Sequence, residues 1–458
     1  MTETITAGVA NEGETHPYDY YYRPGMELRP APPRAEISPE WLEMRRRLFS
    51  PWIKVREVPE ETPLTRRVAD HLWQGDELMD DVVRLSRRIG AENLRTMLDT
   101  ALEHGIEAIE EPPAELKALF QQLYSRPGWF DAELFERGRV LMINSSAFAK
   151  LGGQIVNVIM WAYGDPVSAA SGATGQLERY VYRRQLETSD FFRKIALPDT
   201  LDRFSEAFKT NARVRLMHSQ VRQGLKRKWG AEVYAQHGDP ISNTDMALGV
   251  PAYGVINLII DASLGRRVTM ADLEAVNMYW RYNAYRFGVS EEVIPQNAVE
   301  AIEMFDYVLS RLGKGTQWSE GIAKTLTDFA HTMMTSSDSK LANLVGEKVA
   351  FPLYCAIVAH LGGDPVGYRT VEAGGFSQKQ LKAFGTAYQI LGGAAVRLSA
   401  LADRRPGRWR RMRLRAADGD GFINGQHKMI EALGAKNGVL SATFDAYDTR
   451  KSGDFHKK

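Results

Sequence analysis

Apolar residues recur at spacings of three and four along most of this chain, and this spacing constrains the fold more than any other feature. One run between residues 65 and 88 consists of Val68, Leu72, Leu78, Val82 and Leu85. The ranges 91–108 and 114–125 repeat the pattern. Almost no stretch alternates apolar and polar residues with period two between turn residues, as a half-buried strand would. The sequence therefore predicts an all-α protein.

The first residues differ in composition from the rest of the chain. Residues 1–37 contain five prolines within a polar sequence, which predicts an extended N-terminal arm. Ser38-Pro39-Glu40 then supplies the N-cap, the proline and the acidic residue that open a helix. No long Gly/Ser-rich linker divides the rest of the chain. We therefore expect one large helical domain over residues 38–435 and a C-terminal tail over residues 436–458.

Composition excludes several classes of protein. The net charge of +1 gives no electrostatic footprint for nucleic acid. Cys355 is the one cysteine, so an intramolecular disulfide and a cysteine-rich metal site are excluded. No export signal is recognisable before Met26, which predicts a cytoplasmic protein. The longest apolar run, Gly249 to Ile260, is shorter than the ~20 residues that cross a bilayer, so no membrane span is expected.

Two helical stripes between residues 177 and 225 carry polar groups in unusual places. The first stripe is Leu177, Val181, Arg184 and Thr188, and it ends in a charge and a hydroxyl. The second is Val214, His218, Val221 and Leu225, with one imidazole on an apolar face. Pro198-Asp199 lies between them as a break and an N-cap, so the two helices can fold back on each other.

His218 has two interpretations at this point. A histidine on an apolar helical face can be a core residue whose ring nitrogens bind neighbouring groups. It can also be a ligand to a cofactor, which the polar end of the companion helix would then face. The pattern alone leaves both open.

A specific resemblance rests on these residues. Arg184 and Thr188, followed by His218 in an Arg-Val-Arg-x-x-His-x-x-Val-Arg run, resemble the signature of the rubber oxygenase catalytic-domain family. Gly238-Asp239-Pro240-Ile241 resembles that family's Gly-x-Pro-Ile segment. Trp280 to Val289, with Pro295 after it, resembles its tryptophan–arginine helix that ends in a glycine. The resemblance covers residues 130 to 400.

The resemblance implies a fold, a cofactor and a reaction. Such family members are all-helical, have a globin-like core and bind b-type haem. His218 would be the proximal iron ligand, with Arg184 and Thr188 at the haem pocket. An arginine there can pair with a haem propionate, and Arg184, Arg215 and Arg222 are the candidates. The implied function is oxidation by O2 of an apolar substrate such as an isoprenoid, with cleavage of a carbon–carbon double bond.

The sequence departs from the family at two positions. The family has a lysine directly before the threonine, and here the residue is Glu187. The family also uses a glutamate one helix upstream as a base. Ser168 stands at that offset, and Glu178 is the nearest alternative. Both departures bear on the cleavage chemistry more than on haem binding.

Other functions stay open. Glu187 could manage protons in a haem hydroxylase or peroxygenase, and a sensor or oxygen carrier would need no turnover. A helical protein without a cofactor is a further alternative. His331, His360 and Cys355 are the rival iron ligands, and His360 also fits a helix C-terminus.

Two further features have no assigned role. The small residues between Leu151 and Gly175 indicate either close helix packing or room for a flat ligand. The basic run from Arg404 to Arg415 fits a solvated face, or contact with an anionic surface. The sequence does not determine the oligomeric state.

Overall fold

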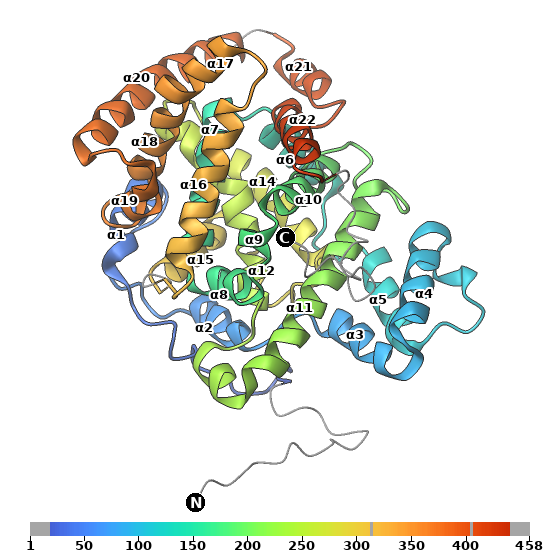
Figure 1. The fold of residues 1–458 in the computed structure, drawn as a ribbon. Helices are drawn as coiled ribbons and strands as arrows, with labels where there is room; N and C mark the ends of the chain where they lie inside the picture. The colour runs from blue at the N-terminus through green and yellow to red at the C-terminus, as the bar shows by residue number, and fades with distance from the viewer. Residues whose placement is uncertain (1–18, 312–314, 404–405, 440–458) are drawn as a thin grey trace, which may run out of the picture.

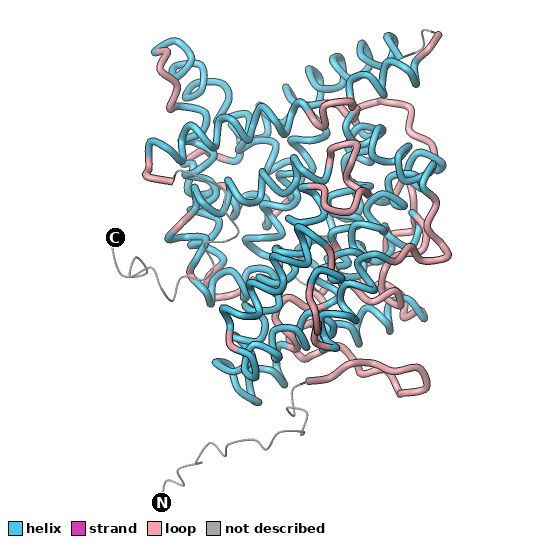
Figure 2. The backbone as a smooth tube through the Cα atoms, turned by 90° about the vertical axis from the view of Figure 1, so that its right-hand side faces the viewer, coloured by secondary structure: helices cyan, strands magenta, loops and turns pink. Residues whose placement is uncertain are grey.

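The computed structural model describes residues 19–311, 315–403 and 406–439 (Figure 1). Within these ranges the chain forms helices and loops and no β-strand (Figure 2), so the predicted all-α fold is confirmed. The α-helices are α1 (Leu42–Phe49), α2 (Pro63–Asp70), α3 (Glu77–Ile89), α4 (Ala91–His104), α5 (Ala114–Tyr124), α6 (Ala132–Ile143), α7 (Ala147–Tyr163), α8 (Asp165–Thr174), α9 (Gln176–Arg179), α10 (Val181–Ile195), α11 (Glu206–His237), α12 (Asn243–Ala247), α13 (Ile256–Ser263), α14 (Met270–Arg286), α15 (Ala298–Leu309), α16 (Ser319–Thr335), α17 (Lys340–Val345), α18 (Phe351–Gly362), α19 (Val366–Thr370), α20 (Gln378–Asp403), α21 (Arg408–Arg415) and α22 (Gly421–Lys436). Shorter 3-10 or π segments are η1 (Pro39–Trp41), η2 (His71–Trp73), η3 (Ile106–Ala108), η4 (Val250–Val255), η5 (Gly346–Ala350) and η6 (Glu372–Gly374).

Helix α14 lies at the centre of the core. It is buried along most of its length, as expected for a helix with apolar residues on all sides. It packs against α6, α15 and η4. The approach of α6 is close because Gly138 has no Cβ; a Cβ there would lie 1.9 Å from the carbonyl oxygen of Ala275. Figure 1 shows α14 behind α9 and α10. This central helix also contains Trp280 to Arg286, part of one segment on which the sequence resemblance rests.

A second group of helices surrounds α18. The helix packs between α7 and α20, and it ends at Gly362, before Gly363 with φ of 70°. His360 lies in its last turn, so the expected position of this histidine near a helix C-terminus is confirmed. On the other side, α7 contacts α13 and α16. Together these helices cover the side of α7 away from the N-terminal region.

The N-terminal helices form a smaller cluster of their own. The buried residues of α3, α4 and α5 pack with Phe208 and Ala212 at the start of α11. The helical pattern between residues 65 and 88 forms α2, η2 and α3, because the backbone is extended at Gln74 and at Asp76, the N-cap of α3. A Cβ at Gly75 would lie 2.2 Å from Nε of Arg222, so a larger residue there would displace the arginine.

The described part of the N-terminal arm packs on this chain. The Tyr20 hydroxyl donates to Asp70 at 2.7 Å, and the Tyr21 hydroxyl donates to Asp80 at 2.9 Å. The first helical segment begins at Pro39, and the Ser38 hydroxyl caps it by accepting from the Glu40 amide. Residues 1–18 of the predicted arm and residues 440–458 of the predicted tail lie outside the described residues.

Two helical stretches meet the length and composition of a membrane span. They are Asn243–Ser263 and Lys340–Gly362, with 67% and 56% of their apolar windows buried in the protein. The first extends beyond the apolar run expected from the sequence because α12, η4 and α13 are continuous. Since core helices pass the same test, neither stretch is a clear membrane span.

Candidate functional site

Helices α10 and α11 lie side by side. The second predicted stripe lies wholly on α11, but the first is divided, since Leu177 lies on α9 and Val181, Arg184 and Thr188 lie on α10 after a break at Tyr180. The connection between α10 and α11 is longer than expected. Helix α11 begins at Glu206, where the Ser205 hydroxyl accepts a hydrogen bond from the Phe208 amide. Asp199 therefore does not cap α11, and that prediction was wrong. Phe204, just before the cap, has φ of 73°. The kink of α11, at a glycine with φ of 71°, lies well past the second stripe.

A cavity of about 270 Å³ lies between the two helices, and we call it the His218 cavity. Both stripes contribute to its wall. The stripe residues that line it are Leu177, Arg184, Thr188, Val214, His218 and Val221. Helix α14 and the segment after it add Trp280, Ala284 and Phe287. The apolar residues around His218 therefore face a cavity as well as the core.

His218 stands out from the other histidines of the described residues by its surroundings. Its ring stacks on Phe287 with ring centroids 6.3 Å apart. Burial, and then the charges of Arg222 and Arg184, lower the pKa of His218 to about 3, so the imidazole is neutral near pH 7, as a metal ligand must be. No hydrogen bond to either ring nitrogen is found in the described part of the chain. His71 is also buried without a hydrogen bond, but it lines neither this cavity nor the one beside it.

The rival ligands are engaged elsewhere. His360 hydrogen-bonds with Gln389 at 2.6 Å, and His331 contacts Glu347 at 2.7 Å. Burial raises the pKa of the Cys355 thiol to about 12, so a thiolate is disfavoured. Among the described residues, no group of three or more His, Cys, Asp or Glu side chains could hold a metal ion.

A buried polar group lies on α10 at the cavity wall. Glu187 is 1% exposed and lies 3.2 Å from Arg184 and 3.3 Å from Arg183. Burial raises the pKa of Glu187, and the two arginines oppose that shift. The Thr188 hydroxyl donates to the Arg184 carbonyl at 2.8 Å, a common arrangement within a helix. Sequence alone left open whether Glu187 faces the pocket; its carboxyl borders the cavity.

Arg215 and Arg222, two of the three arginines expected at the haem pocket, do not line the cavity. Arg215 binds Asp76 at 2.8 Å, and Arg222 binds Asp80 at 3.0 Å, both on the α3 side. The reason is helical geometry. Residues 215, 219 and 222 form the stripe next to that of residues 214, 218 and 221, turned by about 100°. Of the three candidate arginines, Arg184 alone faces the cavity.

Ser168, which stands where the family has its upstream glutamate, and Glu178, the alternative acid, also lie away from the cavity wall. Ser168 is buried and its hydroxyl is 3.1 Å from that of Thr316. Glu178 is exposed. The acids that line the cavity are Glu187 and Asp245, whose carboxylate also caps α12 by accepting from the Ser242 amide.

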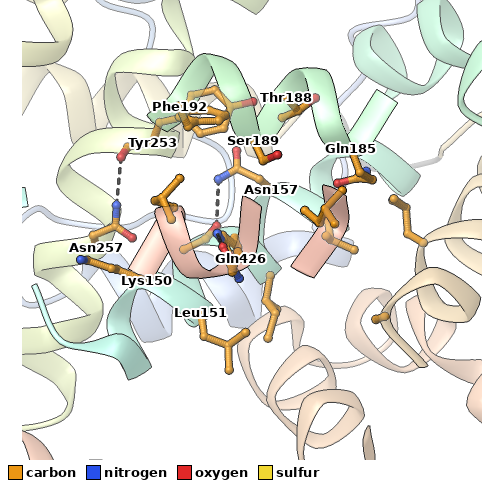
Figure 3. Close-up of a pocket in the computed structure, with 18 of the residues that line it drawn as sticks. Lys150, Leu151, Asn157, Gln185, Thr188, Ser189, Phe192, Tyr253, Asn257 and Gln426 are labelled. Atoms are coloured by element: carbon orange, nitrogen blue, oxygen red, sulfur yellow. Dashed lines mark hydrogen bonds between the residues drawn. The ribbon is translucent and has the colours of Figure 1, made fainter. Parts of the chain in front are cut away.

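A second cavity, of about 250 Å³, adjoins the first, and we call it the α22 cavity (Figure 3). Five residues line both cavities: Trp161, Thr188, Phe192, Tyr253 and Trp280. The remaining wall comes from α7, α10, α13, α16, α18 and α22. Sequence reasoning missed this cavity, although the neighbouring Gly153, Gln154 and Asn157 on α7 are unusual for a core helix.

Some of the small residues between 151 and 175 permit close helix packing, and others leave room for a ligand. A Cβ at Gly153 would lie 2.1 Å from Asn257, and one at Gly172 would lie 2.2 Å from Trp318, so these glycines permit close packing. Ala170 and Ser171 line the His218 cavity. Close packing therefore explains the glycines, and room for a ligand explains the end of α8.

Comparison with known proteins agrees with the resemblance. Residues 144–364, slightly under half of the chain, match the family model described as "ER-bound oxygenase mpaB/B'/Rubber oxygenase, catalytic domain". No curated protein sequence matches the chain significantly. The solved structure of Latex Clearing Protein LCP in the closed state superposes with a TM-score of 0.52 at 20% identity. That match covers 78% of this chain and 91% of the other, and it establishes a shared helical fold.

Proposed function

We propose that this relative of the rubber oxygenase catalytic-domain family is a b-type haem oxygenase that uses O2 on an apolar substrate. The observation that carries the proposal is the His218 imidazole. It is neutral, lines a cavity and has no hydrogen-bond partner in the described chain. A polar side chain enclosed by protein normally has a partner, so a ligand to its nitrogen is the simplest explanation. The match over residues 144–364 supports the same assignment.

The residues of the His218 cavity fit a haem. His218 would hold the iron from α11, and Leu177, Val214 and Phe287 would contact the apolar macrocycle. Arg184 supplies a cation for a carboxylate of the cofactor. A bound haem would provide the O2 and redox chemistry, which amino-acid side chains do not supply.

The chain's own residues would manage protons and exclude water. Glu187 is buried beside Arg183 and Arg184, so its carboxyl can hold a proton at higher pH than an exposed glutamate does. Phe192, Tyr253 and Trp280 line both cavities, and the Phe192 and Tyr253 ring centroids are 4.8 Å apart. Their apolar faces would keep bulk water from the reacting groups. Glu187 would therefore hold the proton, and the aromatic rings would limit the access of water.

Cleavage of a carbon–carbon double bond is the reaction that the family implies, and hydroxylation or peroxygenation is the second candidate. The observation that favours the second is Glu187, a proton-active carboxyl where the family has a lysine. A haem sensor or oxygen carrier is the non-catalytic alternative. Product analysis by mass spectrometry separates the two reactions, because cleavage gives two carbonyl fragments from one substrate.

The deciding experiment is an absorption spectrum of the protein as isolated, followed by a pyridine haemochrome assay. We expect a Soret band and about one haem b per chain. Uptake of O2 on addition of an isoprenoid then separates an oxygenase from a sensor or carrier. A protein that binds no haem, even when haemin is added during purification, contradicts the proposal.

A further inference from the structure

The α22 cavity differs from the His218 cavity in its neutral polar side chains. These side chains are Gln154, Asn157, Gln185, Ser189, Asn257 and Gln426. Figure 3 labels five of them, Asn157, Gln185, Ser189, Asn257 and Gln426, which lie on several elements around one space together with Phe192 and Tyr253. The arrangement gives one part of the cavity wall amide and hydroxyl groups rather than charges.

Helix α22 is attached to this wall by specific polar contacts. Gln154 and Gln426 exchange amide hydrogen bonds of 2.6 and 2.9 Å between α7 and α22. Ser189 on α10 lies 2.9 Å from Nδ1 of His427. Because α22 lies outside residues 144–364, this part of the wall is not part of the matched catalytic domain.

The other side of the cavity is apolar. Leu326, Phe329 and Met333 line it from α16, and Ile430 lines it from α22. The unbranched methionine side chain adapts to ligands of different shape. This side can therefore bury a hydrocarbon body.

Charge in the cavity is internally balanced. Lys150 binds Asp420 at 2.7 Å, and both side chains line the wall. An ionised ligand would lose its hydration without gaining an unpaired counter-charge from these two groups. A neutral ligand is therefore favoured.

We propose that the α22 cavity binds the organic substrate, and that this substrate is a neutral apolar molecule with one hydroxyl or carbonyl group. The amides would hold the polar group and α16 would bury the hydrocarbon. Gln154 and Gln426 would set the selectivity. That this ligand is a substrate rests on the proposed function, since the α22 cavity shares five wall residues with the His218 cavity. Binding of the ligand itself is tested independently of haem.

The test uses the full chain and three probes: farnesol, the hydrocarbon farnesane and farnesyl phosphate. Binding is followed by quenching of tryptophan fluorescence, since Trp161 and Trp280 line both cavities. We expect farnesol to bind at least 10-fold more tightly than either other probe. Equal affinities for the three probes, or no binding of farnesol, would overturn the proposal without any variant.

A matched pair of variants locates the polar group. Gln154→Leu/Gln426→Leu keeps the side-chain size and removes both amides, and it should abolish the preference for farnesol over farnesane. The control is Gln380→Leu on α20, whose exposed side chain contacts Ser377 and lies on neither cavity. An unchanged preference in the double variant, with an unchanged melting temperature, contradicts the role of the amides. Haem content, read from absorption, reports separately on the proposed function.

A second inference comes from the surface of α20 and α21. Exposed aliphatic side chains lie on these two helices instead of in the core: Ile390 (65%), Leu391 (61%), Leu398 (67%) and Leu414 (66%). On α20 they lie off the buried stripe of Leu381, Tyr388 and Val396. Figure 1 places both helices along the upper edge of the molecule.

Basic residues adjoin this apolar surface. Helix α21 contains five arginines and no acid, and Arg408, Arg410 and Arg413 are exposed. Arg404 and Arg405, which the predicted basic run also includes, lie outside the described residues. An apolar stripe beside arginines is the composition that binds the interface of an anionic bilayer. A second copy facing α21 across a two-fold axis would bring like charges together.

We infer that this surface docks on an anionic phospholipid bilayer. The test is flotation of the full chain with vesicles of phosphatidylcholine alone or mixed with phosphatidylglycerol. We expect binding to the mixed vesicles only, and a loss of at least 10-fold in Leu391→Ser/Leu398→Ser and in Arg410→Ala/Arg413→Ala. Met26→Ser, an exposed change in the N-terminal arm, is the control. No binding to anionic vesicles, or a dimer in light scattering that the leucine variant dissociates, overturns the inference.

Discussion

The His218 cavity and the α22 cavity share a wall but are assembled from the chain in different ways. Most of the His218 cavity comes from residues 170–253, and two helical stripes within that range indicated its polar groups. The α22 cavity brings together α7, α10, α16 and α22, from Met142 to Ile430. A cavity built from neighbouring helices leaves a pattern in the sequence, whereas one built from distant helices depends on the packing of the whole domain.

Two kinds of buried charge lie near the cavities. Glu187 lies at the His218 cavity with Arg184, while Asp80 and Arg222 are buried together beside the N-terminal cluster. Glu187 lines the same cavity as His218, whereas Arg222 lies four residues after His218 on α11. We expect a change at the first group to alter turnover and a change at the second to alter stability, and mutation can test this division.

The largest effect is expected for His218→Ala. This change removes the proposed iron ligand, so the purified protein should lose nearly all bound haem. Haem content is measured by the pyridine haemochrome assay. The control is His360→Ala, which should keep its haem because that imidazole hydrogen-bonds with Gln389. Full haem in the first variant and loss in the second would reverse the assignment.

The second prediction concerns the buried pair of Asp80 and Arg222. Asp80→Asn removes the charge that balances Arg222, so it should lower the free energy of unfolding by about 3–5 kcal/mol. Chemical denaturation measures this change. Haem content per folded molecule should stay at the parent level, because Arg222 does not line the cavity. Loss of haem with stability intact would return Arg222 to the cofactor site.

Glu187→Gln should have a smaller effect on a different property. The change keeps size and removes the ionisable group, so turnover should fall by ~10²-fold while haem content is kept. Burial raises the pKa of Glu187, so its protonated form persists to higher pH than that of an exposed glutamate. If the carboxyl donates a proton, parent turnover falls as pH rises through this raised pKa. The variant should lack that limb of the pH profile, and turnover within about two-fold of the parent would contradict the role.

Sequence reasoning was most accurate where structure is local. The helix N-cap at Ser38, the position of His360 near the end of α18 and the stripe of α11 each depend on a few consecutive residues. It was less accurate in the loop before α11, where Ser205 rather than Asp199 is the cap. Both residue types are good caps, so propensity alone does not choose between them.

The arginines and the second cavity show what local patterns leave out. Arg215 and Arg222 lie three and four residues from His218, yet they lie on another face of α11. There they form ion pairs with Asp76, the N-cap of α3, and with Asp80 on α3. Those partners are more than a hundred residues away, and their pairing depends on the tertiary fold. The contribution of α22 to a cavity wall has the same cause, since no short-range pattern links its glutamine to the one on α7.

The smallest expected effect concerns the lysines near the cavity, and it tests the departure at Glu187. We predict that no lysine caps the iron in the resting protein. Lys194, the lysine of α10, is held by Asp190 at 2.8 Å and by Glu206 at 3.4 Å, and it does not line the His218 cavity. Lys194→Ala should therefore leave the absorption spectrum of the haem-loaded protein unchanged.

Glu187→Lys, which restores the family's residue at the cavity wall, is the informative counterpart, because a lysine there could reach the open side of the iron and shift the spectrum to a low-spin form. The contrary result is a low-spin parent spectrum that Lys194→Ala converts to high spin. It would show that Lys194 leaves Asp190 and Glu206 to bind the iron, so that the presence of Glu187 in place of the family's lysine does not prevent capping.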